Sequence, residues 1–376
     1  MPSDILGHVL HTRPFRGFDP IPDVPPLDLD NLSSLNKYGK EIYLTSIDNV
    51  TTNPSWLLGE TPDATGALRN STACAVVVVE RSHQQVDAFY FYFYSFNEGA
   101  DITQVVPPLD RIFPDASPGN HFGDHVGDWE HNMIRFKEGK PTGIYFSQHG
   151  SGQACKWDDE TCFSKQGERP VVFSARGSHA NYPSAGQALP LGRSHIHDEA
   201  LVDIADKGRI WDPVQPAYFY QYDPATDVLT PADPGTYPTD WFHFTGAWGD
   251  KKYNDSDPRQ VTVPYFGLKK YENGPTGPKC KHLVRKGLMP DERPKPNMMK
   301  VLVGWYLSLY GCCLKGHSAW VVIIFTLVAL AATIFVMVLT IKKVGPTLRR
   351  RLRRRRGEKG SAELNIPLLD VERAED

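Results

Sequence analysis

The densest group of residues able to do chemistry in this sequence lies in HFGDHVGDWEHNMIRF, residues 121–136. Within it, His125, Asp128 and Glu130 combine an imidazole with two carboxylates, and an apolar run follows. Such nitrogen and oxygen donors suit a divalent cation (Ca²⁺, Mg²⁺, Mn²⁺ or Zn²⁺) when they converge on one point. The same residue types also suit acid–base chemistry.

A β-strand through this segment would place Asp128 and Glu130 on the same face, because side chains two residues apart share a face. Trp129 would then point to the opposite face, into a core, while His125 in the preceding glycine-flanked turn joins the carboxylates. The alternative is structural, with Asp128 capping a turn and Glu130 in a surface ion pair. We assign the two residues after Glu130 to the strand rather than to the site.

Two further histidines lie at the ends of apolar strands, in YFSQHGSG (145–152) and FSARGSHANYP (173–183). If these strands neighbour the first one, His149 and His179 reach the same face and complete a metal site. The alternative is that each is a hydrogen-bonded histidine with a structural role. Ser178 suggests a serine nucleophile, but the sequence has no Gly-x-Ser-x-Gly elbow and pairs no carboxylate with His179, so we disfavour a serine hydrolase.

The elements that must position these residues are mainly β-strands separated by glycine and proline. β-Branched and aromatic runs predict strands at 74–80, 86–96, 132–136, 143–149 and 169–175. Helical periodicity is clearest at 198–208. The pattern predicts a mainly β fold, with a jelly-roll-like β-sandwich domain over residues 1–271.

A long uncharged stretch, SAWVVIIFTLVALAATIFVMVLTI, occupies residues 318–341. At about 1.5 Å per residue it is long enough to cross a hydrocarbon core of about 30 Å, so it predicts one C-terminal transmembrane helix. The basic tail 342–376 belongs in the cytosol by the positive-inside rule, and the preceding chain belongs in a lumen or outside the cell. Residues 272–317 are predicted to form a stalk, since 272–300 carry glycine, proline and lysine.

Two further patterns agree with a lumenal location for the domain. N-glycosylation sequons precede the uncharged stretch at Asn31, Asn49, Asn70 and Asn254. The disulfide candidates, which also precede it, are Cys155 with Cys162 around a short polar loop, and Cys74 and Cys280. No cysteine pair here has the Cys-x-x-Cys spacing of a zinc site, which favours disulfides over metal binding.

Two further expectations follow from the first residues of the chain and from its net charge. MPSDILGHVLHTRPFRGF contains no apolar run typical of a signal peptide. A lumenal domain needs a route across the membrane, so we expect that an N-terminal strand and a signal peptide precede this sequence in the natural protein. The net charge of −3 gives no reason to expect nucleic-acid binding.

At YLTSIDNVTTNPSWLLG, VDAFYFYFYSFNEG, GDHVGDWEHNMIRF, YFSQHGSG, RPVVFSARGSHANY and WDP, the sequence closely resembles the fungal vacuolar protein sorting-associated protein 62 family, over roughly residues 2–250. The resemblance implies a role in protein trafficking to the vacuole. More distantly, HVGDWE resembles the motif of necrosis- and ethylene-inducing peptide-like cytolysins, β-sandwich proteins that hold a divalent cation and target membrane sphingolipids. That resemblance implies ligation by His125, Asp128 and Glu130, but valine and glycine replace two other motif residues, which argues against toxin activity.

These observations support two hypotheses. The first is a single-pass membrane protein of the secretory or vacuolar system, whose lumenal domain binds a cargo protein, a glycan or a lipid headgroup. Its divalent-cation site would comprise His125, Asp128, Glu130, His149 and His179. The second is a membrane-anchored, metal-dependent lumenal hydrolase with Glu130 or His179 as general base. We favour the binding protein and assign no catalytic residue.

Overall fold

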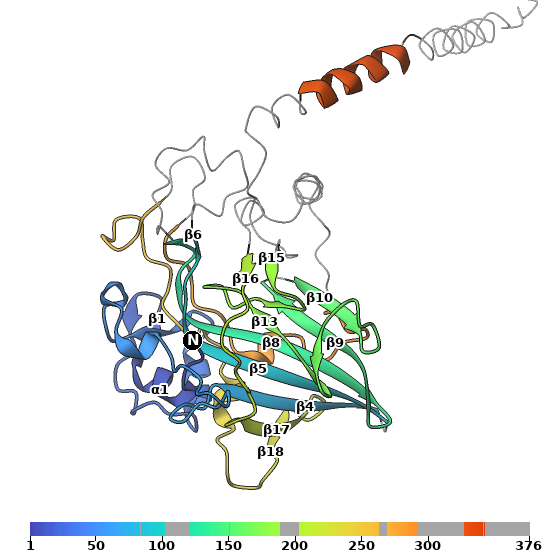
Figure 1. The fold of residues 1–376 in the computed structure, drawn as a ribbon. Helices are drawn as coiled ribbons and strands as arrows, with labels where there is room; N and C mark the ends of the chain where they lie inside the picture. The colour runs from blue at the N-terminus through green and yellow to red at the C-terminus, as the bar shows by residue number, and fades with distance from the viewer. Residues whose placement is uncertain are drawn as a thin grey trace, which may run out of the picture. The chain divides into compact units, whose positions relative to one another are not determined.

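The computed structural model describes residues 1–82, 84–101, 121–149, 151–188, 203–262, 269–291, 327–340 and residue 342. The chain divides into two compact units, Met1–Leu314 and Lys315–Asp376, and each is described by itself. Figure 1 shows that the described part of the first unit is dominated by β-strands.

The first unit is built around a seven-stranded sheet with the strand order β10-β9-β8-β5-β4-β17-β18 (Figure 1). Its strands are β4 (Cys74–Ser82), β5 (Gln85–Asn97), β8 (His125–Lys137), β9 (Lys140–Gln148), β10 (Ser151–Lys156), β17 (Tyr218–Asp223) and β18 (Val228–Pro231). Neighbouring strands are antiparallel except β4 and β17, which are parallel, so the sheet is mixed.

Shorter elements surround this sheet. Near the N-terminus, α1 (Ile5–Leu10) precedes a three-stranded sheet of β1 (Thr12–Arg16), β2 (Asp19–Pro20) and β3 (Ile42–Ser46). Two-stranded ladders pair β6 (Ala100–Asp101) with β7 (His121–Phe122), β11 (Lys165–Gln166) with β12 (Arg169–Pro170), β13 (Phe173–Ser174) with β14 (Asn181–Tyr182), and β15 (Gly186–Ala188) with β16 (Asp203–Ala205). The 3₁₀ helices are η1 (Leu32–Tyr38), η2 (Val50–Thr52), η3 (Ser55–Leu57), η6 (Asp240–His243) and η7 (Pro278–Cys280).

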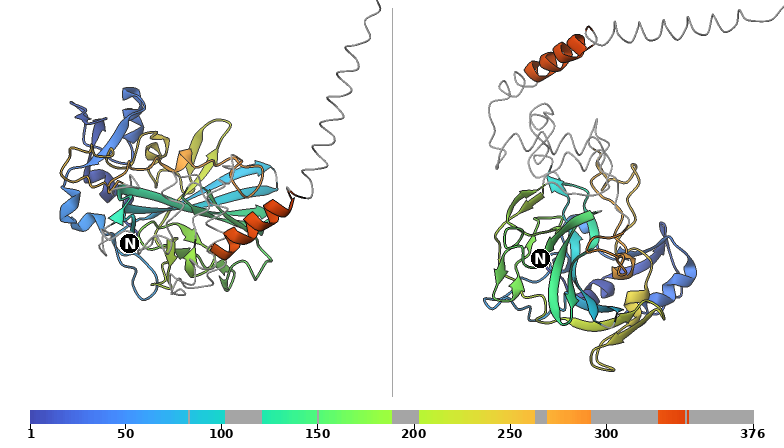
Figure 2. Two further views of the ribbon diagram at one scale, coloured as in Figure 1. Left: turned by 90° about the horizontal axis from the view of Figure 1, so that it is seen from above. Right: turned by 90° about the vertical axis from the view of Figure 1, so that its right-hand side faces the viewer.

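Alternating side chains of β5 and β8 make the two faces of the sheet different. The core face carries fully buried aromatic side chains, Phe89, Phe91, Phe93 and Trp129. The opposite face, called the site face below, carries tyrosines and carboxylates, Tyr92, Tyr94, Asp128 and Glu130. In both views of Figure 2, the green segment after β10 lies on one side of the long strands, and the dark blue elements α1 to β3 and the orange segment lie on the other.

The prediction of a mainly β fold is confirmed, but the arrangement differs from a jelly-roll-like sandwich. In the described part of the chain, one seven-stranded sheet is accompanied by sheets of only two or three strands. The strand predicted at 169–175 is split into β12 and β13, which pair with different strands, β11 and β14. The helix predicted at 198–208 is wrong over 203–205, where pairing with β15 makes strand β16; residues 198–202 lie outside the described residues.

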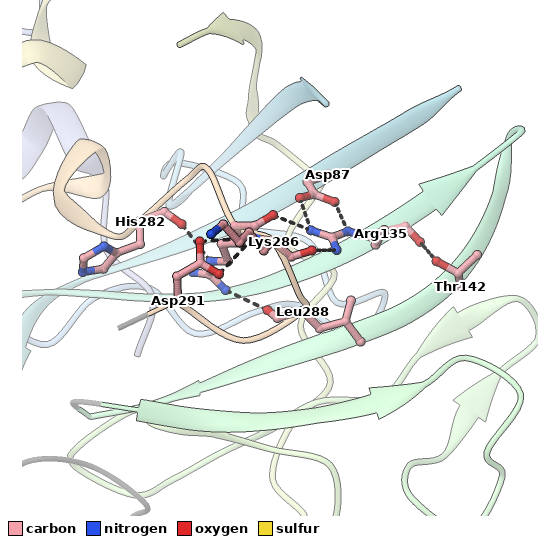
Figure 3. Close-up of polar contacts among 8 residues, drawn as sticks. Asp87, Arg135, Thr142, His282, Lys286, Leu288 and Asp291 are labelled. Carbon is pink, nitrogen blue, oxygen red and sulfur yellow. Dashed lines mark hydrogen bonds and ion pairs between the residues drawn. The ribbon is translucent and has the colours of Figure 1, made fainter. Parts of the chain in front are cut away.

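The described residues 272–291 remain part of the first unit. Residues 281–291, called the strap below, lie on the core face, and Arg285 within them is fully buried. Arg135 on β8 donates hydrogen bonds of 2.7 Å to both carboxylate oxygens of Asp87. The same guanidinium also donates to the main-chain oxygens of Arg285 and Lys286 (Figure 3). The unit therefore includes the strap, although the sequence predicts a stalk from residue 272.

The cysteines are only partly as predicted. Cys155 and Cys162 form a disulfide that closes the polar loop between them. Cys74 and Cys280 are both free, so the prediction of a disulfide at these two residues is wrong. Cys74 is buried among the tyrosines of the site face, whereas Cys280 is exposed in η7, which packs against η6 on the core-face side, so the sheet separates the two thiols.

In the second unit, residues 327–340 are helical. Among the residues that the structure describes, no helix is both long and apolar enough to span a membrane. Residues 318–326 and 341 of the predicted span, and the tail from residue 343, lie outside the described residues. The transmembrane helix therefore stays a prediction.

The buried ion pair between Arg135 and Asp87 yields a prediction about stability. Arg135→Met should lower the free energy of unfolding by about 3–5 kcal/mol, because it leaves the buried Asp87 carboxylate without its charged partner. Arg176→Met is the matched control, since Arg176 pairs with Asp206 at the surface and such pairs contribute about 0–1 kcal/mol. Urea denaturation measures both variants, and equal losses would contradict the prediction.

Candidate functional site

The strand β8 places the two predicted carboxylates as expected. Asp128 and Glu130 lie on the site face, 6% and 7% exposed, and Trp129 is fully buried on the core face. Gly127 precedes them with a φ of 70°, and a Cβ there would lie 1.9 Å from the main-chain oxygen of Trp248. Only glycine fits this close approach, so the start of β8 is held directly against a distant segment.

Asp128 is paired with a histidine from another element. The Nδ1–H of His179 donates to Asp128 over 3.0 Å, and the imidazole stacks on Tyr94 with ring centroids 3.7 Å apart. His179 lies in the turn between β13 and β14 and has a φ of 56°, a left-handed conformation that costs a non-glycine residue about 1–3 kcal/mol. Backbone strain of this kind concentrates at functional sites.

A second histidine is paired with a carboxylate that the sequence analysis did not identify. The Nε2–H of His149 donates to Asp203 over 2.9 Å. Asp203 also accepts hydrogen bonds from Ser178 Oγ at 2.9 Å and Tyr182 Oη at 2.6 Å. His149 likewise has a left-handed backbone, with a φ of 50°. Asp203 lies in a segment with helical periodicity, so no local pattern indicated its role.

Glu130 is held between the strands β8 and β9. Ser147 Oγ on β9 donates to the Glu130 carboxylate and accepts a hydrogen bond of 2.9 Å from the main-chain N–H of His131. The main-chain oxygen of His131 accepts from Asn181 Nδ2 at 3.3 Å. The side chains of Ser147 and Asn181 thus bond to the β8 backbone at this point, beside Glu130.

Two histidine–carboxylate pairs and Glu130 are together called the cluster below: Asp128, Glu130, His149, His179 and Asp203. The charges of the cluster follow from burial and from these contacts. Burial, together with the nearby Asp128 carboxylate, raises the pKa of Glu130 to about 7. Burial alone would raise the pKa of Asp128 as well, but the hydrogen bond from His179 outweighs it and lowers that pKa. Burial lowers the pKa of His179 despite its bond to Asp128. The cluster therefore combines an ionised Asp128 and a neutral His179 with a Glu130 that holds a proton up to near neutral pH.

The predicted metal ligands do not converge in the structure. The ring of His125 turns back on its own strand and donates from Nδ1 to the main-chain oxygen of Gly127 over 2.7 Å. Asp128 and Glu130 each accept from a different protein donor, and His149 bonds to Asp203. In the described ranges, no group of three or more His, Cys, Asp or Glu side chains is arranged to hold a metal ion. These contacts do not fit one cation shared by the five residues. Metal binding by these residues stays a prediction.

The arrangement suits proton exchange or the binding of a polar group. A histidine oriented by a buried carboxylate is the usual form of a general base. A carboxyl group that keeps its proton near neutral pH can donate a hydrogen bond as well as accept one. The strained histidines, the perturbed carboxyls and their burial together indicate a functional site rather than an ordinary polar patch.

Fold and site define the class of this protein as a mainly β domain with a histidine–carboxylate cluster whose carboxylates are buried. The sequence model of the family described as "Vacuolar protein sorting-associated protein 62" matches residues 83–257, which include every residue of the cluster. The chain belongs to this family. No solved structure matches it. The distant similarity to the cytolysin motif stays a prediction.

Two curated relatives from Saccharomyces cerevisiae (strain ATCC 204508 / S288c) are similar to the chain. "Vacuolar protein sorting-associated protein 62" is 34% identical over 304 residues, which cover 76% of this chain and 60% of the relative. "Putative vacuolar protein sorting-associated protein TDA6" is 35% identical over 268 residues, which cover 66% of this chain and 52% of the relative. The chain thus spans between half and two thirds of the length of these relatives.

The raised pKa of Glu130 yields a prediction about pH. Between about pH 4.5 and 7 the folded chain keeps the Glu130 proton that the unfolded chain releases, so stability falls as the pH rises. This contribution is at most about 1.4 kcal/mol per pH unit. Glu130→Gln mimics the protonated carboxyl and should remove it, whereas Glu138→Gln at the exposed hairpin should not. Urea denaturation across this pH range measures the difference, and parallel curves for wild type and Glu130→Gln would refute the assignment.

Proposed function

We propose that this chain takes part in vacuolar protein sorting as a membrane-anchored protein, and that its β domain binds a polar ligand at the cluster around Asp128 and Glu130. The two yeast relatives carry vacuolar protein sorting in their names. The observation that supports the site is that the paired histidines and carboxylates all fall within residues 83–257, the region shared with the family. A ligand with hydroxyl or amide groups, such as a glycan, a lipid headgroup or a cargo peptide, matches these donors and acceptors.

The proposed membrane anchor is supported by the C-terminal sequence. Residues 318–341 carry no charge, and the helical residues 327–340 are apolar around the whole circumference except for two threonines. A helix that is apolar all round needs an apolar environment on every side. The basic residues that follow place the C-terminus in the cytosol, and the domain then lies in a lumen.

A metal-independent hydrolase is the second candidate, and one observation favours it. His179 is oriented by Asp128, and Glu130 beside them keeps its proton at near-neutral pH. Such a site could activate a water molecule at His179 and protonate a leaving group from Glu130. Turnover of a glycoside, ester or peptide by the purified chain would separate this function from binding alone.

The role of the cluster in sorting is tested by removing its central pair. Asp128→Asn combined with His179→Gln should raise the secreted fraction of vacuolar hydrolases several-fold in yeast cells that lack the two relatives and express this chain instead. Asp206→Asn, at an exposed ion pair, is the control and should sort normally. Both variants must be present at wild-type abundance. Normal sorting by the double variant would overturn the proposed site.

Elemental analysis of the same purified proteins addresses the cation. A stoichiometric divalent metal in the wild type that is lost in the double variant would support the predicted metal site. Its absence from the wild type would refute that site and leave the metal-free cluster as the binding site.

The proposed topology predicts N-linked glycans on the domain. Asn49, Asn70 and Asn254 are exposed and should each carry a glycan. Asn31 should be modified least, because it is half-buried and its amide donates to the main-chain oxygen of Pro26. Endoglycosidase treatment followed by mass measurement of each Asn→Gln variant checks these sites. An unglycosylated domain that is open to protease on sealed microsomes would reverse the topology.

A further inference from the structure

The strap and the site lie on opposite faces of the same strand, β8. Arg285 of the strap donates from its guanidinium to Nε2 of His131 over 2.9 Å on the core face. The guanidinium also lies over the rings of Phe89 and Tyr145, 5.1 and 4.5 Å from their centroids. His131 follows Glu130 directly, so this contact is one residue away from the carboxylate at the centre of the site.

Attaching the strap through Arg285 requires the burial of a charged guanidinium, which is unfavourable. Its remaining hydrogen bonds go to the main-chain oxygens of Lys281, His282 and Leu288, and no carboxylate of the described chain accepts from it. Burial lowers the pKa of Arg285 to about 10, which shows how strongly its surroundings disfavour the charge. An apolar side chain would attach the strap at lower cost, so stability alone does not account for an arginine here.

The contact defines the chemical state of His131. Because a guanidinium can only donate, Nε2 of His131 must accept and the ring must be neutral with its proton on Nδ1. Burial and the charge of Arg285 lower the pKa of His131 well below its usual value, in agreement with that state. The ring is packed against Phe89, Phe91 and Tyr145, so Arg285 and these aromatic rings define its position.

The main chain of His131 is bonded directly to the site. Its N–H donates to Ser147, which donates in turn to Glu130, and its carbonyl oxygen accepts from Asn181. Asn181 is two residues from His179. Burial dominates the pKa of both Asp128 and Glu130, and the positive charge of Lys281, also in the strap, opposes the rise that burial causes, so it acts on the same carboxylates.

We infer that the strap positions the functional site, with Arg285 as the positioning residue that acts through His131 on Ser147 and Asn181. The site has its described geometry when the strap is docked, and undocking the strap displaces the Ser147 and Asn181 contacts. The strap precedes the proposed membrane span along the chain, so a partner that displaces it would alter the site. The use of the site in sorting rests on the proposed function, whereas the coupling itself rests on these contacts.

The test compares strap variants of the full chain by NMR and hydrogen exchange under conditions where each is folded. Arg285→Met removes the bond to His131 but keeps a long apolar side chain. It should raise the hydrogen-exchange rate of the His131 amide about tenfold beyond the increase that the change in global stability explains. It should also shift the resonance of the His179 Nδ1–H that bonds to Asp128. Arg285→Lys keeps a donor and should restore much of the wild-type signal.

Asp291→Ala is the matched control, because it loosens the strap without removing the bond from Arg285 to His131. The Asp291 carboxylate accepts from the main-chain N–H of Lys286, the residue after Arg285 (Figure 3). This variant should lower the free energy of unfolding without changing the exchange rate of the His131 amide, beyond what lost stability explains, or the His179 resonance. The inference is overturned if Arg285→Met leaves both signals unchanged, or if both variants change them in proportion to lost stability.

The two proposals fail in different experiments. Normal sorting by the Asp128→Asn, His179→Gln variant would remove the function of the site and leave the coupling intact. Unchanged site signals in Arg285→Met would remove the coupling and leave the function of the site intact.

Discussion

The burial of β8 on both of its faces is the constraint on which the rest of the structure depends. A charged or ionisable group buried without a partner is especially costly, so the buried ionisable side chains of this strand need partners. Asp128 and Glu130 require partners on the site face, and His131 and Arg135 require them on the core face. Every one of these partners comes from another element, which makes β8 the point where distant segments of the chain meet.

The cluster on the site face is costly, which is the physical argument for its function. Two histidines are held in left-handed backbone conformations, and three carboxylates are buried beside them. Apolar residues of similar volume would stabilise the sheet more cheaply. The proposed role in sorting requires selective recognition, and a pre-arranged set of donors and acceptors is suited to it.

The long strands could be predicted from the sequence, whereas their arrangement could not. The runs within β4, β5 and β9 have clear β patterns because each strand is long and well buried. The segment from 272 onward is rich in glycine, proline and lysine and has the composition of a linker, yet Leu283 and Arg285 bury themselves in the domain. Composition predicts how exposed a segment is on average. A few buried side chains are enough to attach a segment of linker-like composition to the domain.

The sequence by itself determined that Asp128 and Glu130 share a face and that Trp129 points to the core, because the two-residue period of a strand is a local property. It also identified the loop closed by Cys155 and Cys162, which are close along the chain. Only the tertiary structure decided that His179 bonds to Asp128, that His149 bonds to Asp203 rather than to a shared cation, and that Ser147 and Asn181 complete the cluster. Those contacts depend on the register between strands far apart in sequence, which no local pattern encodes.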